Sequence, residues 1–194
     1  LSSMVSFGAI LAISFFLSPY IVKKLGVEAN GFITLANNFV SYASLVAIAL
    51  NSMAGRFITI KLHQNDVDGA NKYYTVVTLG NFILALFMLV PSVFCVIYLE
   101  RVINIPPHLV VDVKLLFACI IGNFLLSTAF SSWGIATFVT NRLYIQSIRN
   151  MQSQLIRVVI IIGLFVLLQP SVYYMGVASL VSTLFVVVYS LYYK

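Results

Sequence analysis

Residues 29–55 read ANGFITLANNFVSYASLVAIALNSMAG, and this stretch decides the class of fold. It runs for 27 residues without Asp, Glu, Lys or Arg, whereas a membrane-spanning helix needs about 20 mostly apolar residues. Polar and small residues recur in it at steps of 4, 3, 4, 3, 7 and 4: Asn30, Thr34, Asn37, Ser41, Ser44, Asn51 and Gly55. These steps follow one face of a helix, so the stretch predicts a membrane span whose polar face meets protein or water.

Four further runs lack charged residues, and they extend the same prediction along the chain. They cover residues 1–22, 73–99, 115–141 and 158–193. The last is broken at Gln169-Pro170 and is too short for two full spans, so a fifth helix must begin upstream of it. We therefore expect an all-α membrane protein with a bundle of six helices, at about 1–22, 29–54, 71–98, 113–139, 144–168 and 170–192.

The composition excludes several classes of protein. Of the 194 residues, 61% are hydrophobic and 8% are charged, while a soluble domain carries about 25% charged residues. This excludes a soluble enzyme, a disordered segment and a nucleic-acid binder. The net charge is +6, and the basic residues that cause it lie between the apolar runs, which indicates a signal for membrane topology.

The distribution of basic residues predicts the orientation. One side of the predicted topology holds seven: Arg56, Lys61, Lys72, Arg142, Arg149, Arg157 and Lys194. The other side holds four: Lys23, Lys24, Arg101 and Lys114. The positive-inside rule places the richer side, and with it both ends of the chain, in the cytoplasm. Because the chain begins at Leu1 inside an apolar run, we expect it to be a piece of a longer polypeptide.

No catalytic or metal-binding pattern occurs in the predicted spans. His63 and His108 fall on opposite sides of the membrane, all five acids lie in predicted loops, and Cys95 and Cys119 have no metal-ligand spacing. We expect a protein that is not an enzyme, with no cofactor and no metal.

Polar residues within the predicted spans are the candidates for a site. The candidate cavity residues are Arg56, Arg149, Arg157, Asn37, Asn38, Asn51, Asn81 and Asn123. Amides and hydroxyls either join helices by hydrogen bonds or line a water-filled lumen, and both interpretations stay open. Arginines either extend to the interface or mark a pathway. Arg142, Gln146, Arg149, Ser153 and Arg157 share one helix face, and such a cluster of guanidinium groups suits a phosphate.

Residues 24–32 read KLGVEANGF and contain the pattern LGxExxG, followed by the polar-striped helix. Residues 51–56 and the loop 65–70, NDVDGA, complete the similarity. Over about residues 24–75 the chain resembles the polysaccharide-biosynthesis flippases, the Wzx-type exporters of O-antigen (lipopolysaccharide), capsule and exopolysaccharide units. These belong to the multidrug/oligosaccharidyl-lipid/polysaccharide (MOP) superfamily.

The resemblance implies a fold of two six-helix lobes around a central cavity, with residues 1–194 as the N-terminal lobe and the C-terminal lobe outside this chain. It implies a cell inner-membrane transporter that moves a polyprenyl-pyrophosphate-linked oligosaccharide by alternating access. Its partners would be the lipid-linked oligosaccharide, membrane lipid, the second lobe, a polysaccharide polymerase and glycosyltransferases, and no nucleic acid.

Arg56 is the one residue carried over as a phosphate contact, and Gly26, Glu28 and Gly31 are expected to form a turn. The predicted helix 1–22 carries no charge, unlike lipid II flippases of the superfamily, which argues against a peptidoglycan precursor. A MATE-type ion-coupled exporter of small molecules and a non-transporting membrane scaffold remain alternatives.

Overall fold

The structure, a computed structural model, describes residues 2–139, 143–168 and 170–192, and these parts are helical without any strand. The elements are α1 (Ser2–Leu25), α2 (Val27–His63), α3 (Val67–Ile97), α4 (Leu99–Val102), the 3₁₀ turn η1 (Pro107–Leu109), α5 (Val110–Ala129), α6 (Ser132–Val139), α7 (Leu143–Leu167) and α8 (Tyr174–Tyr192).

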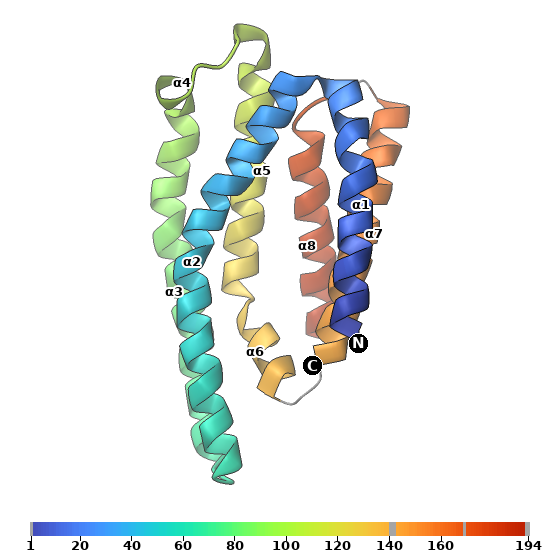
Figure 1. Ribbon diagram of the computed structural model, residues 1–194. Helices are drawn as coiled ribbons and strands as arrows, with labels where there is room; N and C mark the ends of the chain where they lie inside the picture. The colour runs from blue at the N-terminus through green and yellow to red at the C-terminus, as the bar shows by residue number, and fades with distance from the viewer. Residues whose placement is uncertain (1, 140–142, 169, 193–194) are drawn as a thin grey trace.

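The long helices form one bundle (Figure 1). α5 packs against α2, α3 and α8, while α7 packs against α1 and α8. The helices α2 and α3 form an antiparallel hairpin that extends beyond the other helices at one end, and α1 begins and α8 ends at that same end. The core lies between α5, α7 and α8, where Leu116, Phe117, Ile161 and Ala178 are fully or almost fully buried.

Two predicted ranges differ most from the structure, while 71–98 and 170–192 begin at Val67 and Tyr174 instead. α2 continues from the predicted end at 54 to His63, since residues 56–63, RFITIKLH, contain no helix breaker. The predicted helix 113–139 is instead two helices, α5 and α6, separated at Phe130-Ser131. There the backbone bonds become i→i−3, and the hydroxyls of Ser127 and Ser131 donate to the carbonyls of Phe124 and Thr128. Side-chain hydroxyls that bond nearby carbonyls in this way compete with the helical ladder.

Four helices in the described part of the chain are long and apolar enough to cross a membrane: Val27–His63, Val67–Ile97, Pro107–Ala129 and Tyr144–Leu167. A shorter apolar helix covers Tyr174–Tyr189. The protein is therefore an α-helical membrane protein by length and composition, and the count of six spans stays a prediction.

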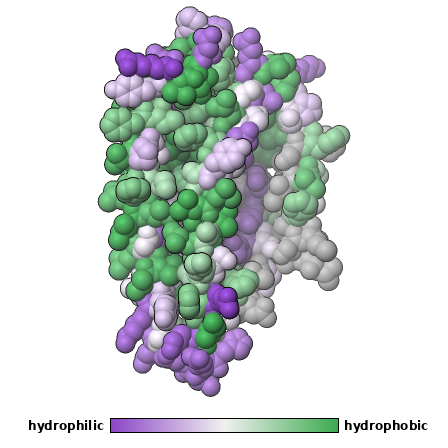
Figure 2. All heavy atoms as spheres, turned by 60° about the vertical axis from the view of Figure 1, so that its left-hand side comes forward, coloured by the Kyte–Doolittle hydropathy of each residue, from purple (hydrophilic) through white to green (hydrophobic). Residues whose placement is uncertain are grey.

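The surface matches this conclusion. Figure 2 shows a green apolar belt between two hydrophilic ends, with a hydrophilic strip in a recess at the edge of the belt. On α3 the belt includes Ile83, Leu86, Phe87 and Phe94, which are all exposed. A continuous apolar face of this kind favours contact with lipid.

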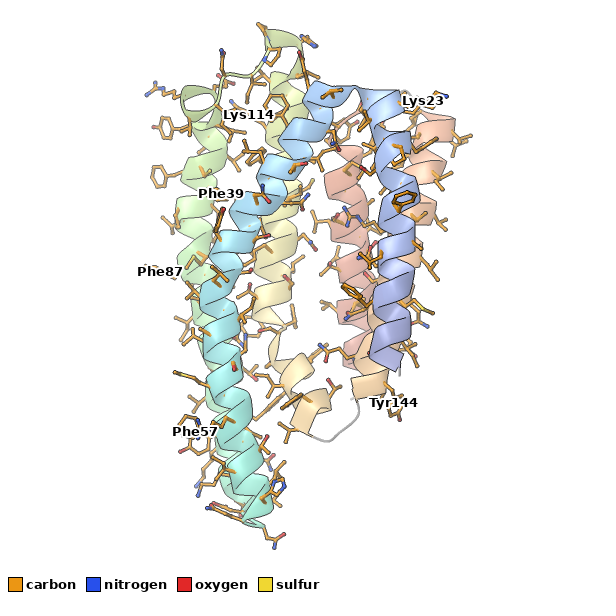
Figure 3. All side chains as sticks on the ribbon, in the orientation of Figure 1. Lys23, Phe39, Phe57, Phe87, Lys114 and Tyr144 are labelled. Carbon is orange, nitrogen blue, oxygen red and sulfur yellow. The ribbon has the colours of Figure 1, made fainter. Side chains whose placement is uncertain are left out.

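Most charged residues lie toward the ends of the bundle, and Arg149 and Arg157 inside α7 are exceptions. Lys23 and Lys114 lie at one end and Tyr144 lies toward the other (Figure 3), with Lys114 ion-paired to Glu100. The α1–α2 turn contains Gly26 at φ 87°, a left-handed conformation that favours glycine, so the predicted role of Gly26 is confirmed. Glu28 lies in the first turn of α2, whereas Gly31 lies inside α2 rather than in the turn.

Candidate functional site

An open groove of about 980 Å³ lies between α2, α5, α6 and α7. Arg56 stands exposed on its α2 side, and Gln146 of α7 closes the opposite side. The groove combines hydroxyls and amides with apolar side chains: Ser44, Ala47, Ile48, Asn51, Ser52, Gly55, Thr59, Ile60, Phe124, Ser127, Thr128, Ser131, Gly134, Ile135 and Phe138. It offers an elongated surface with polar and apolar parts.

A second, smaller cavity lies between α2, α5, α7 and α8 and is called the inner cavity below. Its volume is about 170 Å³, and it is lined by residues of α2, α5, α7 and α8: Asn37, Ile120, Asn123, Ser153, Gln154, Arg157, Ser179, Ser182 and Thr183. Eight of these nine side chains are polar. A cavity with such a lining at the centre of an apolar bundle is suited to water or ions rather than to lipid.

A third cavity of about 290 Å³ connects the two and contains Arg149. It shares Ser127, Ser131, Gly134 and Gln146 with the groove, and it shares Thr183 with the inner cavity. The three cavities therefore adjoin one another, residues of α7 line each of them, and together they are called the polar path below.

Arg157 lies at the middle of α7, 14 residues after Leu143 and 10 before Leu167. At 1.5 Å per residue, the two ends of the helix are about 21 Å and about 15 Å away. Its Nε atom is buried and has no hydrogen-bond partner among the described residues. A charged side chain at this depth of a membrane helix costs at least about 2.5–3.5 kcal/mol and commonly marks a functional site.

Arg149 lies two turns closer to the start of α7. Its guanidinium carbon is 5.5 Å from the centre of the Tyr189 ring of α8. This cation–π contact holds the charge against the wall of the connecting cavity. Arg142 falls outside the described residues.

Asn51 and Asn81, predicted as cavity candidates, lie together with Ser131 in what we call the asparagine cluster. Nδ2 of Asn81 donates to Oδ1 of Asn51 at 2.9 Å. Nδ2 of Asn51 donates to Oγ of Ser131 at 3.1 Å and to the carbonyl of Ala47 at 2.8 Å. Asn81 is buried. The cluster thus joins α2, α3 and the α5–α6 break, which favours the packing interpretation for these two residues.

The other three predicted asparagines lie in two different places. Asn37 donates to the carbonyl of Ile33 at 2.8 Å and lines the inner cavity, where Asn123 has a buried, unpartnered Oδ1. Asn38 is exposed on α2 and lines none of the three cavities. The structure therefore brings Asn37, Asn123 and Arg157 together.

The predicted set missed Ser182, which is buried in the inner cavity and donates to the carbonyl of Ala178 at 2.7 Å. Ser182 lies three residues after Ser179, so the two share one face of a helix, and helical periodicity could have predicted Ser182 as a cavity residue. Among the described residues, no group of three His, Cys, Asp or Glu could hold a metal ion.

Comparison with known proteins supports the conclusion that this chain is part of a membrane protein. No protein-family model matches the chain, and no solved structure matches it. The chain is 33% identical over 183 residues to a Bacillus subtilis (strain 168) protein described as the uncharacterized membrane protein EpsK. The match covers 93% of this chain and 36% of that protein, so the chain spans about a third of its relative's length.

Proposed function

We propose that this chain forms one lobe of a multi-pass transporter that moves a polyprenyl-pyrophosphate-linked oligosaccharide across the cytoplasmic membrane. The observation that carries the proposal is the polar path with Arg56, Arg149 and Arg157 through an otherwise apolar helix bundle. A charged side chain at membrane depth, such as Arg157, is costly and commonly marks a functional site, and the exposed Arg56 adds a second cation beside the same cavities. The resemblance to the flippases and the similarity to a membrane protein support the same proposal.

The groove has features that suit such a substrate. Arg56 offers a planar, permanently charged fork that binds phosphate oxygens in pairs. The hydroxyls of Ser44, Ser52 and Thr59 offer hydrogen bonds to sugars, and Ile48 and Phe138 offer apolar contact to a prenyl chain. At about 980 Å³ the groove lies at the upper end of the size range of ligand sites.

The proposal includes a second lobe from the rest of the polypeptide, with transport by alternating access and no catalysis. Both ends of the chain then face the cytoplasm. Arg56, Lys61 and Lys72 on the α2–α3 hairpin support this orientation under the positive-inside rule.

The first experiment uses cells that lack the intact gene. Polyprenyl-linked sugars are extracted and identified by mass spectrometry, with leaflet location measured by access of a membrane-impermeant glycosidase. We expect one oligosaccharide to accumulate on the cytoplasmic leaflet. Unchanged lipid-linked sugars together with unchanged surface polymer would overturn the proposal and favour export of a small molecule.

The second experiment tests the path itself in the full-length protein. Arg56→Ala combined with Arg149→Ala is expected to reduce export at least tenfold at unchanged protein level, because a charge-assisted hydrogen bond to phosphate contributes about 1.5–3 kcal/mol. The control is Arg101→Ala, whose guanidinium lies 5.1 Å from the Tyr98 ring, outside the three cavities. Equal export by the double variant and the control would exclude Arg56 and Arg149 from transport.

A further inference from the structure

Arg157 lacks a compensating negative charge within this chain. All five acids of the sequence lie among the described residues, at helix ends or in loops: Glu28, Asp66, Asp68, Glu100 and Asp112. The ion pairs Lys61–Asp66 and Lys114–Glu100 join described residues, and Arg157 belongs to neither. An isolated buried charge is costly unless a counter-charge or hydrogen bonds meet it, so an anion at this position would stabilise the protein.

The inner cavity presents several hydrogen-bond donors besides the guanidinium. Ser153, Gln154 and Thr183 line it and make no side-chain hydrogen bond to another described residue. The amide of Asn123 has a buried, unpartnered Oδ1, and a half-turn of this amide presents its NH₂ group instead. The charge of Arg157 and these neutral donors form the set that an anion requires.

The size of the cavity limits the anion. Its volume of about 170 Å³ is smaller than the roughly 300 Å³ at which ligand pockets begin, and a water molecule takes about 30 Å³. A chloride-sized ion with a few waters fits this volume, whereas the groove has the room that a sugar-phosphate needs.

We propose that the inner cavity binds a small monovalent inorganic anion, such as chloride, as the counter-ion of Arg157. Arg157 is also part of the polar path of the proposed function, but binding of an anion to this site can be measured without transport. Its occupant neutralises a charge at the centre of the lobe and joins α5, α7 and α8, the helices that also form the core.

The experiment measures thermal unfolding of the purified full-length protein in detergent while chloride replaces gluconate at constant ionic strength. For the unaltered protein we expect the Tm to rise and saturate, as linkage requires for an ion that binds only the folded state. Arg157→Gln is expected to lose this rise, and Lys114→Gln, which removes a paired cation at the end of the bundle, is expected to keep it.

Several outcomes would overturn the proposal. A Tm independent of chloride would mean that Arg157 has another counter-charge, such as an acid from the rest of the polypeptide. The same rise in Arg157→Gln would assign it to a different site. Saturation with inorganic phosphate but not chloride would make the ligand a phosphate group. If Arg157→Gln does not fold, anomalous scattering from bromide in crystals of the unaltered protein decides: a peak beside Arg157 supports the site, and its absence excludes it.

Discussion

The asparagine cluster and the inner cavity are both polar regions inside an apolar bundle, yet their hydrogen bonding differs. In the asparagine cluster, Asn81 donates to Asn51, and Asn51 donates to Ser131. In the inner cavity, Arg157 and Asn123 each keep a buried polar atom without a partner among the described residues. Hydrogen-bond pairing, rather than polarity, therefore distinguishes residues that join helices from residues whose polar atoms are free to bind a ligand.

The chemistry of the two groups explains the difference. A carboxamide both donates and accepts, so a second carboxamide on a neighbouring helix satisfies it. A guanidinium only donates, so Arg157 needs an acceptor of negative charge, and the acids of this chain all lie near helix ends. The first region is therefore complete within this chain, and the second is not.

The largest effect is expected where α5 and α8, two of the helices that line the inner cavity, pack most closely. Gly176 of α8 packs so closely on α5 that an added Cβ would lie 2.6 Å from Cβ of Cys119 and 3.1 Å from the carbonyl oxygen of Leu116. Gly176→Ala is expected to destabilise the protein by about 1–3 kcal/mol, measured by thermal unfolding in detergent, because overpacking forces α5 and α8 apart. Gly163→Ala in α7, where nothing lies within 4 Å, is the control and should leave stability equal or higher. Equal behaviour of the two variants would contradict the close approach.

The asparagine cluster is tested by a double-mutant cycle. Asn51→Leu and Asn81→Leu should each destabilise the protein by about 1–3 kcal/mol, because the first leaves Nδ2 of Asn81 without its acceptor and the second leaves Oδ1 of Asn51 without its donor. The two changes should couple by about 0.6–1.7 kcal/mol, the range of hydrogen bonds between membrane helices. The matched pair Asn38→Leu with Asn81→Leu should be additive, since Asn38 is exposed and lies outside the cluster. Additivity of the first pair would show that the bond contributes nothing.

The sequence predicted the long helices because a charge-free run of sufficient length is a local property. It did not predict the break at Phe130-Ser131, because the break depends on hydroxyls that bond their own helix instead of continuing the ladder. Ser44 in α2 also donates to the carbonyl three residues back, that of Ser41, and there the helix continues. The local pattern is the same in both places, and only packing decides between them.

The polar stripe of α2 shows a similar limit for the site. Asn37 and Asn51 are two residues of one stripe, which periodicity predicted to meet protein or water, and Asn37 is exposed while Asn51 is half-buried. Asn51 nevertheless meets Asn81, while Asn37 lines the inner cavity. Periodicity gives the face of a helix, whereas the partner depends on which helix lies opposite at that height.

Arg157 is expected to differ from Asn81 in how its removal changes stability. Replacing Asn81 should lower the free energy of unfolding, whereas replacing Arg157 should leave it equal or raise it. In chloride-free buffer, Arg157→Met is expected to match the unaltered protein within about 1 kcal/mol or to exceed its stability, since replacing a buried charge with an apolar group is commonly neutral or stabilising. Urea or thermal unfolding of the unaltered protein and of Arg157→Met, each without chloride and at saturating chloride, measures the difference. A strong loss of stability without chloride would mean that Arg157 is already paired within the intact protein.

The smallest expected effect concerns Asp66, a polar group that is satisfied but lies outside the bundle. The Asp66 carboxylate accepts from Lys61 Nζ at 2.9 Å and from the backbone N–H of Gly69 at 2.8 Å. The hydrogen bond from Lys61, followed by that from Gly69, lowers the pKa of Asp66 below its usual value of 3.8. Since the folded-state pKa is the lower one, the carboxylate stabilises the fold above about pH 4, and this contribution is lost as the pH falls through the folded-state value.

Asp66→Asn should therefore unfold at a slightly lower temperature than the unaltered protein at pH 5, and the two curves should converge below pH 3. Solvent screens the exposed pair, so the difference should be smaller than any of those above and should shrink further in high salt. In a Lys61→Met background the difference between Asp and Asn at position 66 should decrease, because the largest cause of the lowered pKa is gone, while the Gly69 N–H still favours the carboxylate. A difference in unfolding temperature that grows toward acid pH would contradict the lowered pKa of Asp66. A loss of stability as large as that of Asn81→Leu would mean that an exposed polar pair contributes as much as a polar pair inside the bundle.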